Sequence, residues 1–394
     1  MKSTQMTNQL QIKLLHRAAR NCSLDDVKFL IEEKGTDING KYRKVKALHW
    51  AARGGSLEVI KYLIEKGAKI NRKNNTDTRL LLWAVRGRSL EVIKYLIEKG
   101  AKINRKSHSA NTKVLLWAIR GGSFEIVKYL LDKKAVRISK KYYNSAELLR
   151  WAKLVRSVEM IKYLIKKGVN IDARTMNNET LLHWAVNRGL REFAQYIIGK
   201  GTRVNDKEIN GKTALHLAAN KGSCELVKYL IEIKDVDINT KDHFNETPLH
   251  LAVTKKHLKL INLMLNNAKN INVNVQNRNG ETPLHLAIII GSLKAVKYLI
   301  ETKEINLNVK NARGETPLHQ AAIKGSLKLT KCLIEKGADL NIKDKNGKTP
   351  LEEAATRNRK EVVTYLTEVS AANTKNNNRK KTAKASTKKK TKKT

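Results

Sequence analysis

Apolar residues along the chain recur at a helical spacing. The segment LEVIKYLIEKG at residues 57–67 places its apolar side chains on one helical face, at Leu57, Ile60, Leu63 and Ile64. The glycine at its end is a typical helix C-terminal stop. A shorter apolar segment, LHWAARGG at 48–55, precedes it, and a polar stretch follows. The pattern predicts two short helices separated by glycine and followed by an extended linker.

The same pair of segments recurs at intervals of 33 to 35 residues. A marker position near the start of each first helix is occupied in turn by His16, His49, Leu82, Leu116, Arg150, His183, His216, His250, His285, His319 and Glu352. All four prolines follow a threonine in the same frame, where threonine suits a helix N-cap and proline the first helical position. Eleven repeats from about residue 10 to 370 predict one continuous stack.

These motifs resemble the ankyrin repeat. The resemblance is carried by ETPLHLA at 246–252, GETPLHLA at 280–287, GETPLHQA at 314–321 and the second-helix pattern SLEVIKYLIEKGA. It implies an all-α repeat solenoid of helix-turn-helix units joined by β-hairpin fingers, with the first helices on a concave side. It also implies a structural role, in hydrogen bonds to backbone, for the motif histidines His49, His183, His216, His250, His285 and His319.

The resemblance divides the chain into three parts: a leader at 1–9, the repeat domain at 10–371 and a tail at 372–394. The motif is weakest in repeats 3 to 5, where Leu82, Leu116 and Arg150 replace histidine. Repeat 5 also lacks the glycine between its helices. We therefore expect a bend or soft point near residues 135–160.

The formal net charge of +43 favours acidic proteins, nucleic acid or anionic membranes as partners. Cys22, Cys224 and Cys332 lack the spacing of a disulfide framework or a zinc site. The chain has no signal-peptide pattern and no apolar run long enough to span a membrane. These features predict a soluble protein of a reducing compartment: cytoplasmic, nuclear, or exported to a host cell by a non-Sec route.

No motif of an enzyme is present. The chain has no phosphate-binding GxxxxGK[ST] loop, no HExxH and no GxSxG. Glu58, Glu91 and Glu125 lie in the first turn of second helices, where they suit the helix dipole. We therefore expect a non-enzymatic protein with no cofactor and no metal site.

The five tryptophans share one frame in repeats 2 to 6, at Trp50, Trp83, Trp117, Trp151 and Trp184. The first three carry an arginine at i+3, at Arg53, Arg86 and Arg120, and Arg188 lies at i+4 from Trp184. Residues at these spacings share a helix face, so a ladder of indole and guanidinium is expected. Two interpretations stay open. The arginines stack on the tryptophans as internal packing, or the ladder faces a partner, since both residue types are enriched in binding hot spots.

The fingers of the same repeats are basic, and their candidate partner-binding cations are Arg43, Lys44, Arg72, Lys73, Arg105 and Lys106. In the later repeats the tryptophan frame holds Leu217, Leu251, Leu286 and Gln320, and the fingers carry ordinary turn sequences. The pattern indicates a specialised surface in repeats 1–6 and plain scaffold in repeats 7–11.

The tail has almost no apolar residues and is expected to be disordered. It contains two basic clusters, Arg379, Lys380, Lys381 and Lys388, Lys389, Lys390, which resemble a bipartite nuclear-localisation signal. The clusters predict nonspecific nucleic-acid binding or a merely solubilising segment.

The leading hypothesis is a monomeric protein–protein interaction scaffold that binds an acidic or mixed partner on the concave and finger surfaces of repeats 1–6. The abundance of Lys, Asn and Ile, with many repeats, resembles ankyrin-repeat proteins of intracellular bacteria and makes the chain a candidate effector. The alternative is a nucleic-acid- or chromatin-associated protein that uses the basic groove and the tail.

Overall fold

The computed structural model describes residues 2–43, 45–70, 79–101, 108–136 and 157–373. Over these ranges the chain consists of helices and turns, and its β structure is limited to one isolated antiparallel bridge between Tyr42 and Val45. The helices form two compact units, Met1–Thr175 and Met176–Thr394. The expected all-α repeat architecture is confirmed.

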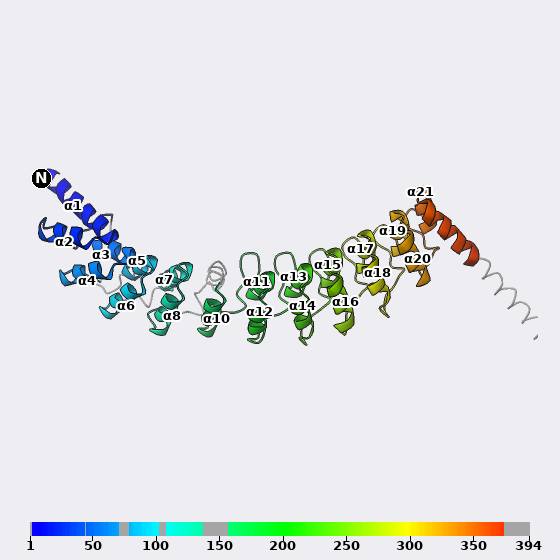
Figure 1. Ribbon diagram of the computed structural model, residues 1–394, viewed down its shortest axis with the longest axis horizontal. Coiled ribbons are helices and arrows are strands. Elements are labelled where there is room, and N and C mark those ends of the chain that lie inside the picture. The colour runs from blue at the N-terminus through cyan, green and yellow to red at the C-terminus, as the bar shows by residue number, and fades with distance from the viewer. Residues whose placement is uncertain (1, 44, 71–78, 102–107, 137–156, 374–394) are drawn as a thin grey trace, which may run out of the picture. The chain divides into compact units, whose positions relative to one another are not determined.

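First and second helices alternate along the N-terminal unit, as Figure 1 shows. The first helices contact one another in sequence and form one row: α1 (Lys2–Arg20), α3 (Ala47–Gly54), α5 (Arg79–Gly87) and α7 (His108–Arg120). The second helices follow them in a parallel row: α2 (Leu24–Glu32), α4 (Leu57–Glu65), α6 (Leu90–Glu98), α8 (Phe124–Asp132) and α10 (Val158–Lys166).

The C-terminal unit has the same two rows (Figure 1). Its first helices are α11 (Leu181–Asn187), α13 (Ala214–Lys221), α15 (Pro248–Thr254), α17 (Pro283–Ile289), α19 (Pro317–Lys324) and α21 (Pro350–Thr356). Its second helices are α12 (Arg191–Ile198), α14 (Cys224–Ile231), α16 (Leu258–Asn267), α18 (Leu293–Ile300) and α20 (Leu327–Glu335). Residues 360–373 are also helical.

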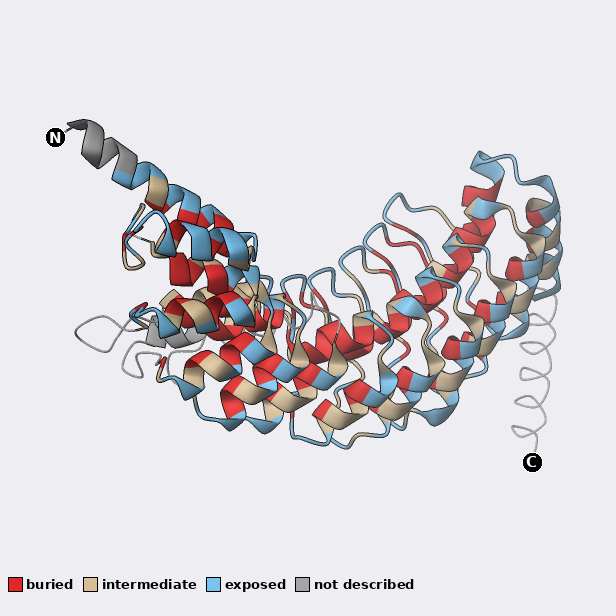
Figure 2. Ribbon diagram, turned by 60° about the vertical axis from the view of Figure 1, so that its left-hand side comes forward, coloured by how far each residue is buried: buried red, intermediate tan, exposed pale blue. Residues whose placement is uncertain are grey.

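Local sequence sets the ends of these helices. Ser56 and Ser89 are N-caps of second helices, and each side chain accepts from the backbone N–H three residues on. Ser292 caps α18 in the same way, with its hydroxyl oxygen 3.3 Å from the Ala295 nitrogen. Apolar residues such as Leu63 are fully buried between the rows, and Figure 2 shows the buried positions gathered on the inward sides of the helices. Burial of this shared face stabilises the stack.

A buried histidine links every repeat of the C-terminal unit except the last, which has Glu352, to the following finger. The Thr282 N–H donates to His285 Nδ1 at 3.1 Å, and the Thr282 hydroxyl lies 2.8 Å from the same nitrogen. Because Nδ1 accepts, Nε2 carries the proton and donates to the Glu315 carbonyl at 3.2 Å. The structural role implied for the motif histidines is confirmed here, since equivalent contacts are made by His183, His216, His250 and His319.

Burial keeps these rings neutral. Desolvation lowers the pKa of His216, His250 and His285 to about 4, against a weaker opposite effect of their backbone hydrogen bonds. A protonated ring would lose the acceptor at Nδ1 and place an uncompensated charge inside the stack. The bridge between repeats therefore requires the neutral form.

The fingers are tight turns that pack backbone against backbone. In the finger before α21, Asp344 Oδ1 accepts from the Lys348 N–H at 2.9 Å and closes the turn. The Lys345 N–H donates to the Arg313 carbonyl of the preceding finger at 3.1 Å. Gly314 has a φ of 77°, and a Cβ there would lie 2.6 Å from the Lys345 nitrogen. This close approach explains the glycine in the motif.

Lowering the pH from about 7 to about 5 should destabilise the C-terminal unit. An unfolded histidine has a pKa of about 6.5 and takes up a proton in this window, whereas His216, His250 and His285 titrate only near 4 when folded. The unfolded state therefore binds more protons, and each histidine should lower the free energy of unfolding by about 2 kcal/mol at about pH 5. Urea unfolding followed by circular dichroism at both pH values measures this loss.

His285→Gln is the matched control for that measurement. Glutamine keeps a hydrogen-bond acceptor three residues after the threonine cap but does not titrate. The free energy of unfolding of this variant should depend less on pH, by the contribution of one histidine. Equal free energies of unfolding at the two pH values would contradict the assignment of neutral bridging rings.

Gly314→Ala should destabilise the stack more than Gly337→Ala. Both glycines have positive φ, 77° and 92°, but a Cβ at Gly337 would meet no atom within 4 Å. The second substitution should therefore cost only the left-handed backbone penalty of about 1 kcal/mol, and the first about 2–4 kcal/mol because it also forces two fingers apart. Chemical denaturation of both variants measures the difference, and equal costs would show that finger contact is unimportant.

Candidate functional site

Tryptophan and arginine side chains alternate along the first helices of the N-terminal unit. The Arg53 guanidinium carbon lies 5.9 Å from the centroid of the Trp50 ring on its own helix and 5.4 Å from the Trp83 ring in the next repeat. Trp50 and Trp83 also meet edge to face at 4.8 Å. We define the Trp–Arg column, in order along the row, as Arg20, Trp50, Arg53, Trp83, Arg86, Trp117 and Arg120.

The column continues in both directions by the same kind of contact. The Arg86 guanidinium lies 4.2 Å from the centroid of the Trp117 ring, and Arg120 lies 4.9 Å from that ring. At the other end, Arg20 of α1 lies 5.3 Å from the ring of Trp50. Each such cation–π contact contributes about 0.5–1 kcal/mol at an exposed site. The column therefore couples neighbouring repeats through their side chains.

Local helix structure places the arginines. Arg53, Arg86 and Arg120 lie in the last turn of α3, α5 and α7, where a cation interacts favourably with the helix dipole. Because the repeats stack at a nearly constant period, each of Arg20, Arg53 and Arg86 reaches the tryptophan of the following first helix.

The column retains accessible surface. Trp50, Trp83 and Trp117 are half-buried, and Arg53 and Arg120 are exposed. A guanidinium stacked on an indole by its face keeps its N–H edge available for hydrogen bonds. The column therefore combines apolar area with guanidinium N–H groups at the protein surface.

The charges of the column repel one another. Burial, together with the neighbouring Arg53 and Arg120 guanidiniums, lowers the pKa of Arg86. Within the part of the chain that the structure describes, no carboxylate forms an ion pair with Arg20, Arg53 or Arg86. These three arginines thus form a strip of like charge without a described countercharge.

The described ion pairs of this unit lie on the row of second helices. Glu32 of α2 accepts from Lys66 Nζ at 2.8 Å and from the Tyr62 hydroxyl at 2.9 Å, and these contacts lower the pKa of its carboxyl. Asp132 of α8 is bound in the same way by Lys167 at 2.7 Å. These two described ion pairs therefore join neighbouring second helices rather than first helices.

Trp184 differs from the other described tryptophans. It lies in the C-terminal unit, is 9% exposed, and packs edge to face against Phe193 with ring centroids 6.0 Å apart. Over the described ranges no cation stacks on its ring, and Arg188 is exposed at the end of α11. Trp151 lies outside the described residues.

One of the six candidate finger-tip cations is described. Arg43 is exposed at the turn between Tyr42 and Val45, and its guanidinium lies 5.6 Å from the centroid of the Tyr42 ring. The remaining finger-tip and tail candidates, and most of the expected soft point, lie outside the described residues: Lys44, Arg72, Lys73, Arg105, Lys106, Arg379, Lys380, Lys381, Lys388, Lys389, Lys390 and residues 137–156.

Sequence reasoning overlooked Arg20 as a member of the column. Its repeat has Arg17 rather than tryptophan in the tryptophan frame, so the Trp–Arg spacing is absent there. The signal was nonetheless present, because Arg20 stands in the same repeat position as Arg53 in the next repeat. The structure adds it as the first cation of the column.

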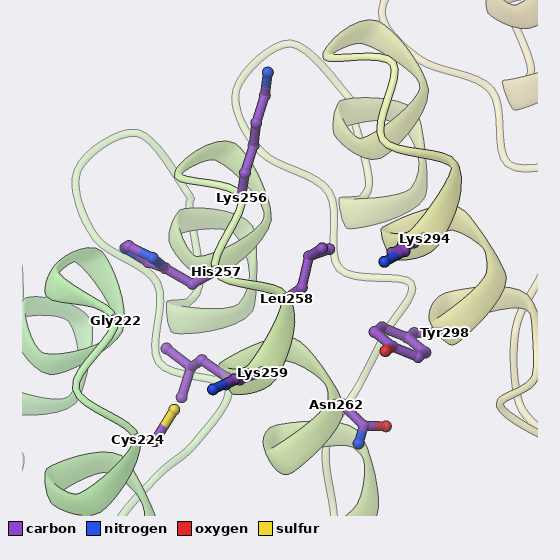
Figure 3. A pocket seen from close by; sticks show the side chains of 10 residues that line it. Gly222, Cys224, Lys256, His257, Leu258, Lys259, Asn262, Lys294 and Tyr298 are labelled. Carbon is purple, nitrogen blue, oxygen red and sulfur yellow. The ribbon is translucent and has the colours of Figure 1, made fainter.

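A hollow of about 620 Å³ on the second-helix row of the C-terminal unit is also basic (Figure 3). Lys256 and Lys294 line it with His257 and Tyr298. The His257 ring points back toward Gly222 in Figure 3, and its Nε2 lies 3.1 Å from the Asn220 carbonyl oxygen. This histidine therefore links neighbouring repeats, and the lysines around it are exposed.

The described ranges offer no site for metal chemistry, since no three His, Cys, Asp or Glu side chains in them are placed to hold an ion. The three cysteines are free thiols. None of the described helices is both long enough and apolar enough to cross a membrane.

Comparison with known families agrees with the geometry. A family model for ankyrin repeats, comprising three copies, matches residues 15–107 and, in five overlapping placements, residues 148–379. A search of curated proteins finds no match.

The contact between Arg53 and Trp83 should be measurable as a coupling free energy. In a double-mutant cycle on unfolding, Arg53→Gln and Trp83→Leu should couple by about 0.5–1 kcal/mol, because the guanidinium rests on that indole. Leucine occupies the same frame in later repeats and preserves the packing. Arg53→Gln and Trp184→Leu, in separate compact units, form the control cycle and should be additive. Additivity in both cycles would refute the interleaved column.

Proposed function

This chain belongs to the ankyrin-repeat family, whose repeats generally mediate protein–protein interaction, and on that premise we propose that it is a non-enzymatic scaffold that binds an acidic protein partner on the Trp–Arg column. The observation that carries the proposal is the strip of like charge along the first helices. Arg53 and Arg86 stack on indoles but form no ion pair with any described acid.

Carboxylates of a partner complement this strip. A carboxylate accepts two parallel hydrogen bonds from the edge of a guanidinium, while the face of the same guanidinium remains on tryptophan. The partner's carboxylates also offset the repulsion of Arg86 by Arg53 and Arg120. Half-buried Trp83 and Trp117 supply apolar area that a partner can desolvate.

Charge outside the column assists association. Arg43 is exposed at a finger tip of the same unit, and we assign it, with the other finger cations, to steering of an acidic partner. Such charges raise the association rate more than they lower the dissociation rate, and salt screens them.

Trp83→Leu with Arg86→Gln should weaken the binding of specific partners to the full-length chain. Partners captured from a cell lysate by the wild type would be purified and their affinities measured for both forms. We expect binding to weaken by about tenfold or more, because two adjacent contacts of a hot spot are removed. Affinity for the wild type should also fall as salt concentration rises.

Lys61→Gln with Lys94→Gln is the control for net charge. Both lysines are exposed on second helices, where they lie over tyrosine rings. This variant should retain partner binding. Retention of every partner by the Trp83/Arg86 variant would show that the column only packs. The nucleic-acid alternative would be favoured if the wild type captured only nucleic acid and both variants lost that binding equally.

A further inference from the structure

A second, smaller hollow lies on the first-helix row of the C-terminal unit. Its volume is about 380 Å³. Ile289 of α17 and Ile323 of α19 contribute apolar surface, and Gln320 of α19 also lines the hollow. Four cations and one acid complete the lining: Arg313, Lys324, Arg357, Arg359 and Glu315.

Gln320 is the unusual residue of this hollow. It stands in the frame that holds tryptophan in earlier repeats and leucine at Leu251 and Leu286. Its side chain is 6% exposed, yet neither Nε2 nor Oε1 has a hydrogen-bond partner among the described residues. Burial of an unpaired amide destabilises a fold, so such a group points to a role that packing does not provide.

The rim of the hollow is built from anchored cations. Arg357 Nε donates to Glu353 Oε2 at 3.2 Å, and Arg359 Nε donates to the Ile323 carbonyl at 3.0 Å. Both side chains are exposed, so their outer nitrogens face solvent and the chains can move aside for a ligand. With four cations against one acid, the lining has an excess of positive charge.

We propose that this hollow binds an acidic peptide segment of a partner protein. The peptide's backbone N–H donates to Gln320 Oε1, and a backbone carbonyl accepts from Gln320 Nε2. A neighbouring carboxylate side chain binds the outer nitrogens of Arg357 and Arg359, while an apolar side chain rests on Ile289 and Ile323.

The chemistry of Gln320 favours a peptide over a phosphate. A side-chain amide presents a donor and an acceptor side by side, and a peptide group complements both. A phosphate ester of nucleic acid only accepts hydrogen bonds, so it would leave Oε1 unpaired. The site lies in the C-terminal unit, and the proposal is independent of the Trp–Arg column.

Selection from a displayed library of random short peptides tests the site. The full-length chain is immobilised as wild type and as Gln320→Leu, and enriched peptides are synthesised and their affinities measured. Peptides selected by the wild type should carry Asp or Glu beside an apolar residue. They should bind Gln320→Leu about tenfold more weakly, because both hydrogen bonds to the backbone are lost.

Thermal unfolding separates this effect from misfolding. Gln320→Leu places the residue of neighbouring repeats in the same frame, so its unfolding midpoint should rise while its affinity falls. Arg357→Gln should weaken acidic peptides and reduce their salt dependence. Arg188 is an exposed arginine at the end of α11, so Arg188→Gln is the matched control. It should change neither the affinity for acidic peptides nor its salt dependence.

Three outcomes would overturn the proposal. The first is enrichment of the same peptides by wild type and Gln320→Leu, and the second is enrichment without acidic residues or no enrichment at all. The third is that Gln320→Leu and Arg357→Gln lose binding to a short single-stranded DNA but still bind the peptides. That result would assign the hollow to phosphate. The Trp83/Arg86 variant should bind the selected peptides normally, so this proposal and the proposed function fail separately.

Discussion

The hydrogen bond from a buried histidine to the carbonyl of the following finger is the link on which the C-terminal stack depends. A single repeat cannot bury its own apolar face, so its stability comes from its neighbours. His285 joins a helix cap at Thr282 to the finger at Glu315, and it can do so only as a neutral ring with a defined tautomer. Helix capping, register between repeats and finger position are thereby fixed by one side chain.

The N-terminal unit couples its repeats differently. Leu82 and Leu116 replace the bridging histidine in its central repeats, and there the arginine of one repeat stacks on the tryptophan of the next. A histidine bridge is satisfied and buried, whereas a stacked arginine keeps charge and donors at the surface. Both arrangements link neighbouring repeats, but the stacked arginines keep exposed charge and N–H donors.

One position of the repeat illustrates how side-chain chemistry varies on a uniform scaffold. In successive first helices it holds Trp83 and Trp117, then Leu251 and Leu286, then Gln320. Leucine fills the space with no polar cost. Tryptophan adds an aromatic face for a cation, and glutamine adds a buried amide that lacks a partner. A residue other than leucine at this position therefore marks a repeat whose packing is less complete or whose buried polar group lacks a hydrogen bond.

The sequence by itself determined the period, the helix pairs and the cap at Thr282, because these follow from spacing and local hydrogen bonding. The structural role of the histidines followed from the resemblance to the ankyrin repeat. The sequence also identified most members of the Trp–Arg column. Only the tertiary structure decided that Arg53 lies between two indoles and that Arg20 begins the column. It also decided that Trp184 is buried against Phe193. Apart from the contact between Arg53 and Trp50 within α3, these contacts join residues about one repeat or about a quarter of a repeat apart in sequence. Side-chain reach across that separation depends on how the helices stack rather than on any local propensity.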